Sequence, residues 1–99
     1  MTPPVSRLKH FRVTTSVRVA AGLTLRLSVS VRGTHGRPVV HARVYVDSRQ
    51  LGVRRSFSRL TGRHGVAFFK AIHAQRPGNL VVTVRKRGWS PVGVTVVIE

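Results

Sequence analysis

Apolar and polar residues alternate strictly in one stretch of the chain, residues 23–32. Leucine and valine occupy every second position there, and threonine, arginine and serine fill the positions between them. Because successive side chains of a β-strand point to opposite faces, this pattern predicts a strand with one face in the core and one in water. Leu27 is therefore expected to be buried and Arg26 to be exposed.

Weaker or shorter versions of this pattern predict further strands at residues 5–13, 40–46, 50–60, 66–72, 80–85 and 94–98. The strand at 50–60 is expected to be irregular and to contain Val53 and Phe57, and the strand at 66–72 to place Ala71 beside Ala67. The expected core comprises Leu25, Leu27, Val29, Val44, Val46, Ala67, Phe69, Val82, Val84, Val96 and Ile98, while Arg26, Arg43, Thr83 and Thr95 face water. About seven short strands separated by glycine- and proline-containing turns predict an all-β fold, specifically an immunoglobulin-like or Greek-key sandwich.

Length and composition agree with this prediction. The 99 residues suit a single domain, which we expect at residues 8–99 after an N-terminal arm at residues 1–7. Nineteen valines and eight threonines favour sheet over helix, because β-branched side chains fit a pleated surface. No stretch is apolar for long enough to predict a transmembrane segment, and residues 1–11 lack the apolar core of a signal peptide.

The turns carry a more specific pattern. A strand ending in Gly33 is followed by Gly36-Arg37-Pro38-Val39 and then by the run Ala-Arg-Val-Tyr-Val, residues 42–46. Residues 61–68 read Thr-Gly-Arg-His-Gly-Val-Ala-Phe, and residues 77–84 read Pro-Gly-Asn-Leu-Val-Val-Thr-Val. In this order, and with Gly88-Trp89 after them, these motifs resemble bacterial immunoglobulin-like domains of the invasin and intimin type, and are also similar to carboxypeptidase regulatory-like domains.

The resemblance implies a non-catalytic structural or adhesion module, extracellular or at a cell surface, whose partner is another protein or neighbouring copies and domains. Related modules carry an acidic residue before the Gly-x-Ala turn, where this chain has Gly62-Arg63. A calcium site between domains is therefore not expected, and no cofactor is implied.

The charge suggests a second function. Eighteen lysines and arginines stand against Asp47 and Glu99, which gives a net charge of +16 and a field that attracts polyanions. The alternative is thus a polyanion-binding protein that binds nucleic acid or acidic glycan through its arginine-rich surface. A cytoplasmic location is the alternative that goes with this function. Cations spread evenly would favour the structural module, whereas cations gathered on one face would favour the polyanion-binding protein.

Two basic clusters are candidates for polyanion binding. The first is the hairpin cluster Arg85, Lys86, Arg87 and Trp89, in which three cations could hold a phosphate while the indole stacks on a base or sugar. The alternative for Trp89 is that it packs over the end of the sandwich. The second is the patch formed by Arg54, Arg55, Arg59 and Arg63.

The residues do not favour an enzyme. Two carboxylates, one of them C-terminal, offer no acid and base pair, and there is no cysteine and no Gly-x-Ser-x-Gly sequence. The five histidines are scattered without the spacing of metal ligands. We therefore expect no catalytic, cofactor or metal site.

The last strand is a candidate edge for association. Val92, Val94, Val96 and Val97 form a dense β-branched run without charge. Val81, Val92 and Val97 fall on the face where polar residues are expected, so this face is either covered or left as an exposed apolar stripe.

Overall fold

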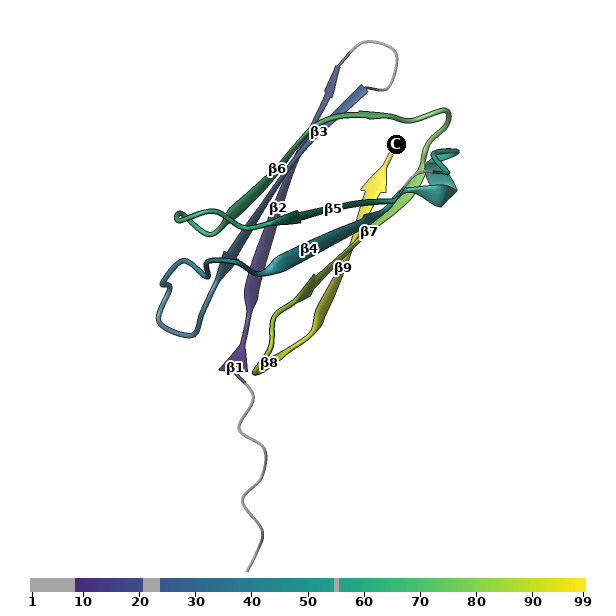
Figure 1. Ribbon diagram of the computed structural model, residues 1–99. Helices are drawn as coiled ribbons and strands as arrows, with labels where there is room; N and C mark the ends of the chain where they lie inside the picture. The colour runs from purple at the N-terminus through teal and green to yellow at the C-terminus, as the bar shows by residue number, and fades with distance from the viewer. Residues whose placement is uncertain (1–8, 21–23, 55) are drawn as a thin grey trace, which may run out of the picture.

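The computed structural model describes residues 9–20, 24–54 and 56–99, and its regular structure is almost entirely β-strand (Figure 1). The strands are β1 (Lys9–His10), β2 (Arg12–Ala20), β3 (Thr24–Arg32), β4 (Arg43–Asp47), β5 (Phe57–Leu60), β6 (Val66–His73), β7 (Gly78–Arg85), β8 (Trp89–Ser90) and β9 (Val92–Ile98). A single 3₁₀ turn, η2 (Arg49–Leu51), interrupts them within the described residues. The predicted all-β class is confirmed. The expected N-terminal arm, residues 1–7, lies outside the described residues.

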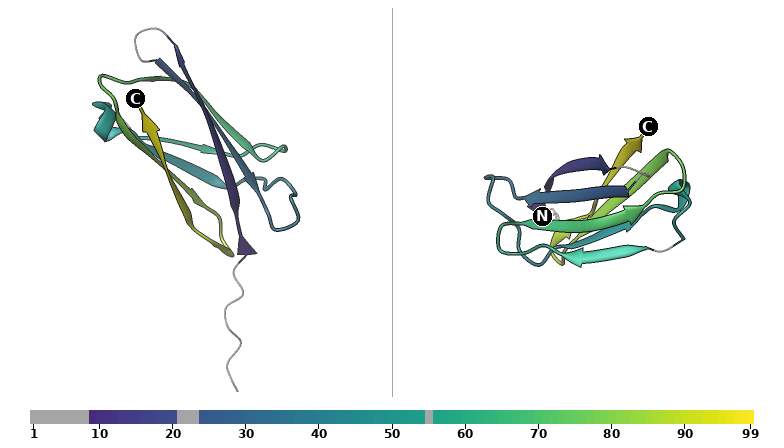
Figure 2. Two further views of the ribbon diagram at one scale, coloured as in Figure 1. Left: turned by 180° about the vertical axis from the view of Figure 1, so that it is seen from behind. Right: turned by 90° about the horizontal axis from the view of Figure 1, so that it is seen from above.

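Seven of these nine strands form two sheets that face each other. One sheet has the order β2-β3-β6 and the other the order β5-β4-β7-β9, and both are antiparallel throughout. Figure 2 shows the two layers from above. At one end, β1 pairs with β8 in parallel, so the short segment that precedes β2 is joined to the short segment that precedes β9. This pairing holds the two sheets together at that end.

The core lies between the sheets and follows the predicted alternation. In β3, Leu25, Leu27, Val29 and Val31 are fully buried, whereas Arg26 is exposed. All the predicted core residues are buried except Val96, which is half-buried against the core. Arg43 and Thr95 face water as expected, while Thr83 is half-buried. Leu23, which the alternation also includes, lies outside the described residues.

A bulge in β6 corrects one part of the predicted core. Leu25 pairs with Ile72 and Leu27 pairs with Phe69, so Lys70 and Ala71 together lie opposite Arg26. An extra residue shifts the alternation by one position. Ala71 is therefore exposed and Ile72 is buried, contrary to the prediction that placed Ala71 beside Ala67.

The strand predicted at residues 40–46 begins only at Arg43, because a turn precedes it. His41 has a φ of 60°, a left-handed conformation that ends a strand. The buried Thr61 fixes this turn: its Oγ1 donates to the carbonyl of Val39 at 2.6 Å and accepts from the amide of Ala42 at 2.9 Å. Val39 is consequently buried, and Val40 is only half-buried.

Two further strands differ in extent from the prediction. Of the strand expected at residues 5–13, residues 5–8 lie outside the described residues, and the remainder contains β1 and the first two residues of β2. β2 runs on to Ala20, opposite the whole of β3. In the region 50–60, η2 comes first, and the strand begins at Phe57. Val53 precedes that strand and packs, half-buried, against the core.

Candidate binding surfaces

Trp89, in the first predicted cluster, is a packing residue at the end where β1 meets β8. Its ring stacks on Phe11 with the centroids 4.7 Å apart and the planes 9° apart. A Cβ placed at Gly33 would lie 3.2 Å from the indole, so Trp89 also covers the start of the turn after β3. Lys9 Nζ lies 5.5 Å from the ring centroid. The indole is half-buried by these contacts, which matches the alternative in which it packs over the end of the fold.

The three cations of that cluster do not converge on one point. Lys86 Nζ donates to the carbonyl of Val40. Arg85 lies on β7 directly opposite Arg43 of β4, and Arg87 is exposed in the turn before β8. The cluster therefore supplies three cations in three different surroundings.

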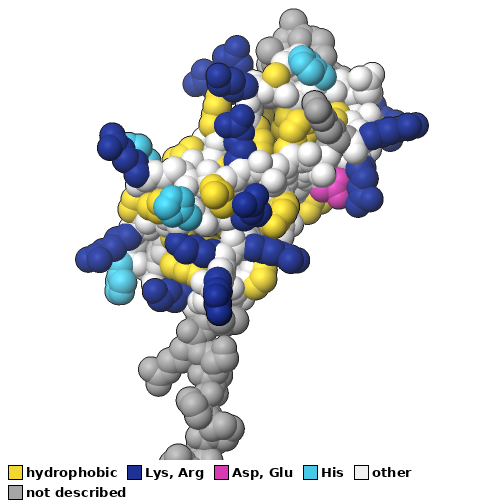
Figure 3. Space-filling view, in the orientation of Figure 1, with side chains coloured by type: hydrophobic (Ala, Val, Ile, Leu, Met, Phe, Trp, Pro, Cys, Tyr) yellow, Lys and Arg dark blue, Asp and Glu magenta, His cyan; other side chains and the backbone are white. Residues whose placement is uncertain are grey.

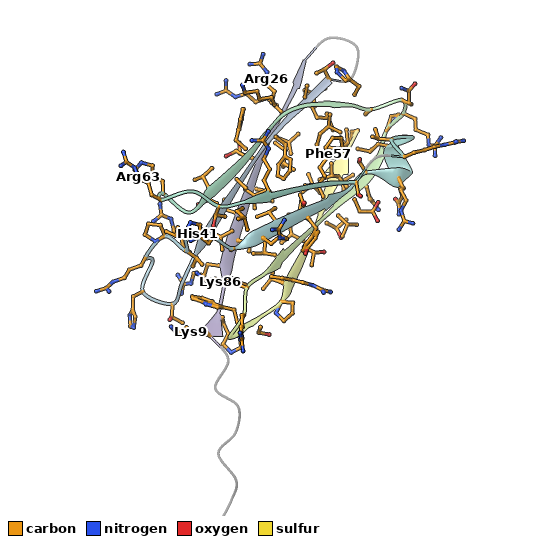
Figure 4. All side chains as sticks on the ribbon, viewed as in Figure 1. Lys9, Arg26, His41, Phe57, Arg63 and Lys86 are labelled. Carbon is orange, nitrogen blue, oxygen red and sulfur yellow. The ribbon has the colours of Figure 1, made fainter. Side chains whose placement is uncertain are left out.

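An open groove of about 420 Å³ lies beside Trp89, and sequence reasoning missed it. Lys9 and Lys86 line it from one side, and His35, Arg37 and Pro38 from the turn after β3. Figure 4 shows Lys9 and Lys86 at the same end of the molecule. Only the fold brings these segments together, since they are far apart in the sequence.

The second predicted cluster does not form one patch. Arg54 lines a depression together with Arg49 and Arg76. Arg59 lies on β5, and Arg63 projects from the turn that follows this strand (Figure 4). Arg55 lies outside the described residues. The described members of the patch are thus distributed along the length of β5 and its two flanking loops.

The outer face of the β2-β3-β6 sheet carries cations that sequence reasoning did not bring together. Arg18 lies directly opposite Arg26, and Arg12 lies directly opposite Arg32. A shallow depression of about 160 Å³ is lined by Ser16, Arg18, Arg26, Ser28 and Phe68. The signal was present, because Val13, Val17 and Val19 alternate with polar residues, but no strand was predicted between residues 13 and 23. Without β2, the arginine pairs could not be found.

The outer face of the β5-β4-β7-β9 sheet is more mixed. Arg43 and Arg85 form a third pair of opposed arginines. Two residues farther along the strands, on the same face, Tyr45 lies opposite Thr83. Asp47 ends β4, and its carboxylate accepts from Arg49 Nη2 at 2.9 Å and from Arg49 Nε at 3.1 and 3.2 Å. These hydrogen bonds hold the pKa of the Asp47 carboxyl below its ordinary value.

The predicted association edge is an edge strand. β9 pairs only with β7 in its sheet, and Val97 is 65% exposed. Val92, Val94 and Val96 form the inner row of β9, and all three are half-buried. Val92 therefore does not lie on the outer face, which corrects its predicted placement, because β9 alternates from Val92 onwards. Val81 is half-buried on β7.

Lysine and arginine side chains are spread over the molecule. Figure 3 shows them across the whole visible face and around its rim, separated by hydrophobic and polar side chains. Within residues 9–20, 24–54 and 56–99, no three histidine or acidic side chains are grouped so that they could hold a metal ion. No helix in the described part of the chain is long and apolar enough to cross a membrane.

Comparisons with known proteins do not place this chain in a family. No family model, no curated protein and no solved structure matches it.

Proposed function

We propose that the chain is a non-catalytic immunoglobulin-like module that serves in a bacterial surface or other multimeric assembly. The strand order supports this proposal. The strands of an immunoglobulin fold are lettered A to G in chain order, and A, B and E form one sheet that faces C′, C, F and G in the other. The order β2-β3-β6 facing β5-β4-β7-β9 is the one expected for that arrangement. The chain crosses between the sheets after β3, β5 and β6, as Greek-key connections do.

The contact surface that we propose is the free edge of β9, which pairs with a strand of a second copy. The observation that carries this proposal is the charge of the four edge strands. β2 contains Arg12 and Arg18, β5 contains Arg59, and β6 contains Lys70, whereas β9 contains no charged residue. Because charged side chains on an edge discourage pairing with another chain, β9 is the edge that is left open to it.

The distribution of charge also supports a module over a dedicated polyanion-binding protein. Cations lie on both outer faces, at the β1–β8 end and around η2. Net repulsion between such domains opposes indiscriminate aggregation. Association through β9 should therefore be specific, and it should strengthen as salt screens the repulsion.

Sedimentation velocity across a salt series tests this function. We expect wild-type protein to form a dimer or larger assembly at high salt. Val97→Lys should weaken the assembly by at least about tenfold, because it adds a positive charge to the interface from each copy, and like charges brought together there cost more than about 1.4 kcal/mol. Leu60→Lys is the matched control, since Leu60 is a 48% exposed apolar residue on the edge strand β5. A protein that stays monomeric at every salt concentration, or equal losses in the two variants, would overturn the proposal.

A further inference from the structure

The arginine pairs on the β2-β3-β6 sheet have no anionic partner on that sheet. Like charges directly opposite each other on neighbouring strands destabilise a sheet. Arg18 and Arg26 form one such pair, and Lys70 lies at the bulge opposite Arg26. The three strands contain no aspartate or glutamate. These cations are therefore available to an anion from outside the molecule.

The surroundings of Arg18 and Arg26 suit a phosphodiester. Ser16 lies opposite Ser28, and both line the same shallow depression as Arg18 and Arg26. An arginine binds two phosphate oxygens at once through its planar fork, and serine hydroxyls commonly donate to phosphate. One row of the sheet thus offers the charge, and the adjacent row offers hydroxyl donors.

An exposed aromatic ring lies in the same depression. Phe68 of β6 pairs with Ser28 and is 44% exposed. Bases stack on aromatic side chains and on guanidinium planes, and such stacking is the usual sequence-independent contact with single strands. A sulfated glycan would use the same cations but has no aromatic base to stack. The ring therefore favours nucleic acid over an acidic glycan.

The two arginine pairs also define a track. Arg12 and Arg32 lie six residues along the strands from Arg18 and Arg26, which is about 20 Å in an extended strand. Thr14 and Ser30 lie opposite each other between the pairs. OB-fold domains, which are also small and all-β, bind roughly 4–16 nucleotides of single strand, so a track of this length suits a segment at the lower end of that range.

We infer that the outer face of the β2-β3-β6 sheet binds single-stranded nucleic acid, with Arg18 and Arg26 holding a phosphate and Phe68 stacking on a base. Arg12 and Arg32 extend the same track, although Arg32 Nη1 also donates to the carbonyl of Gly36 at 2.8 Å. This inference does not depend on the function proposed for β9, because it uses the other sheet.

Fluorescence anisotropy with labelled oligothymidylate tests the arginine pair. We expect Arg18→Gln/Arg26→Gln to weaken binding by about tenfold. The slope of log affinity against log salt should fall by about 0.7, since the two arginines hold one phosphate and each phosphate contact contributes about 0.7 for a single strand. The matched control is Arg43→Gln/Arg85→Gln, which removes an opposed pair of the same charge from the other sheet. Equal losses in the two double variants would overturn the site.

A second pair of variants tests the stacking. Phe68→Ala should weaken oligothymidylate binding by about fivefold or more and leave heparin binding unchanged. Tyr45→Ala, at a 42% exposed aromatic on the other sheet, should change neither. If Phe68→Ala has no effect on oligothymidylate, or if heparin binding falls with it, the face is not a nucleic-acid site. Circular dichroism verifies that each variant is folded, which we expect because all six positions lie on outer faces.

Discussion

The outer faces of the two sheets carry the same element, a pair of opposed arginines, in different surroundings. Around Arg18 and Arg26 lie serines, an exposed phenylalanine and Lys70, and none of the three strands contains an acid. The face that carries Arg43 and Arg85 ends in Asp47, whose carboxylate is bound by Arg49. Charge alone therefore does not define a binding site on so basic a protein. The neighbours of the charge define it.

The largest effect should come from the core that both faces share. Leu27→Ala in β3 and Leu80→Ala in β7 should each lower the free energy of unfolding by about 2–5 kcal/mol, because each removes a fully buried leucine side chain. Urea denaturation measures both. If only one truncation destabilises the protein, the two sheets do not unfold as one unit, and their outer faces cannot be compared as parts of one structure.

The next effect concerns the end where the sheets are joined. Trp89→Ala should cost about 2 kcal/mol, less than a core leucine, because the indole is only half-buried although it stacks on Phe11. Tyr45→Ala is the control, and its effect should stay within about 0.5 kcal/mol as for an exposed position. A Trp89→Ala variant as stable as the wild type would show that this stack does not hold the β1–β8 end together.

A smaller effect distinguishes the two arginine pairs directly. Arg18→Gln/Arg26→Gln should raise the free energy of unfolding by about 0.2–1 kcal/mol, because it relieves repulsion between opposed like charges. Arg43→Gln/Arg85→Gln should raise it by less, since the residue that pairs with Arg43 on the neighbouring strand β5 is Leu60 and not a cation. Salt should reduce both gains through screening. A larger gain for the Arg43 pair at low salt would reverse the comparison.

The smallest effect is the pH dependence of Asp47. Its pKa is lowered in the folded protein by hydrogen bonds from Arg49, so the associated stability is present at neutral pH. It is lost as the pH falls through the unfolded value and then the folded value, from about pH 4 downward. Asp47→Asn should therefore flatten the fall in Tm over that range. An unchanged acid profile in Asp47→Asn would show that this ion pair contributes nothing.

The sequence predicted the sheet core well because the predictive signal was local. Alternation in β3 and β7 identified buried rows that need only the period of two. It could not predict the bulge at Lys70 and Ala71, since an extra residue is visible only against the register of β3. The turn at His41 was missed for a similar reason, because Thr61, which fixes it, is distant in the chain.

The candidate surfaces were less predictable than the fold. Adjacency in the sequence predicts that Arg85, Lys86 and Arg87 act together, but neighbours in a strand point to opposite faces and a turn separates them further. Arg18 and Arg26 are eight positions apart and meet through the hairpin of β2 and β3. Charge clusters on sheets are formed by strand pairing, and the residues of a single strand do not determine which strand it pairs with.

Amide chemical-shift mapping during titration with oligothymidylate tests the difference between the two faces most directly. We predict that the perturbed amides concentrate around Arg18, Arg26 and Phe68 and spread along β2 and β3 toward Arg12 and Arg32. The amides around Arg43 and Arg85 should change little. Perturbations of equal size on both outer faces, or centred on Arg87 and Trp89, would contradict the account.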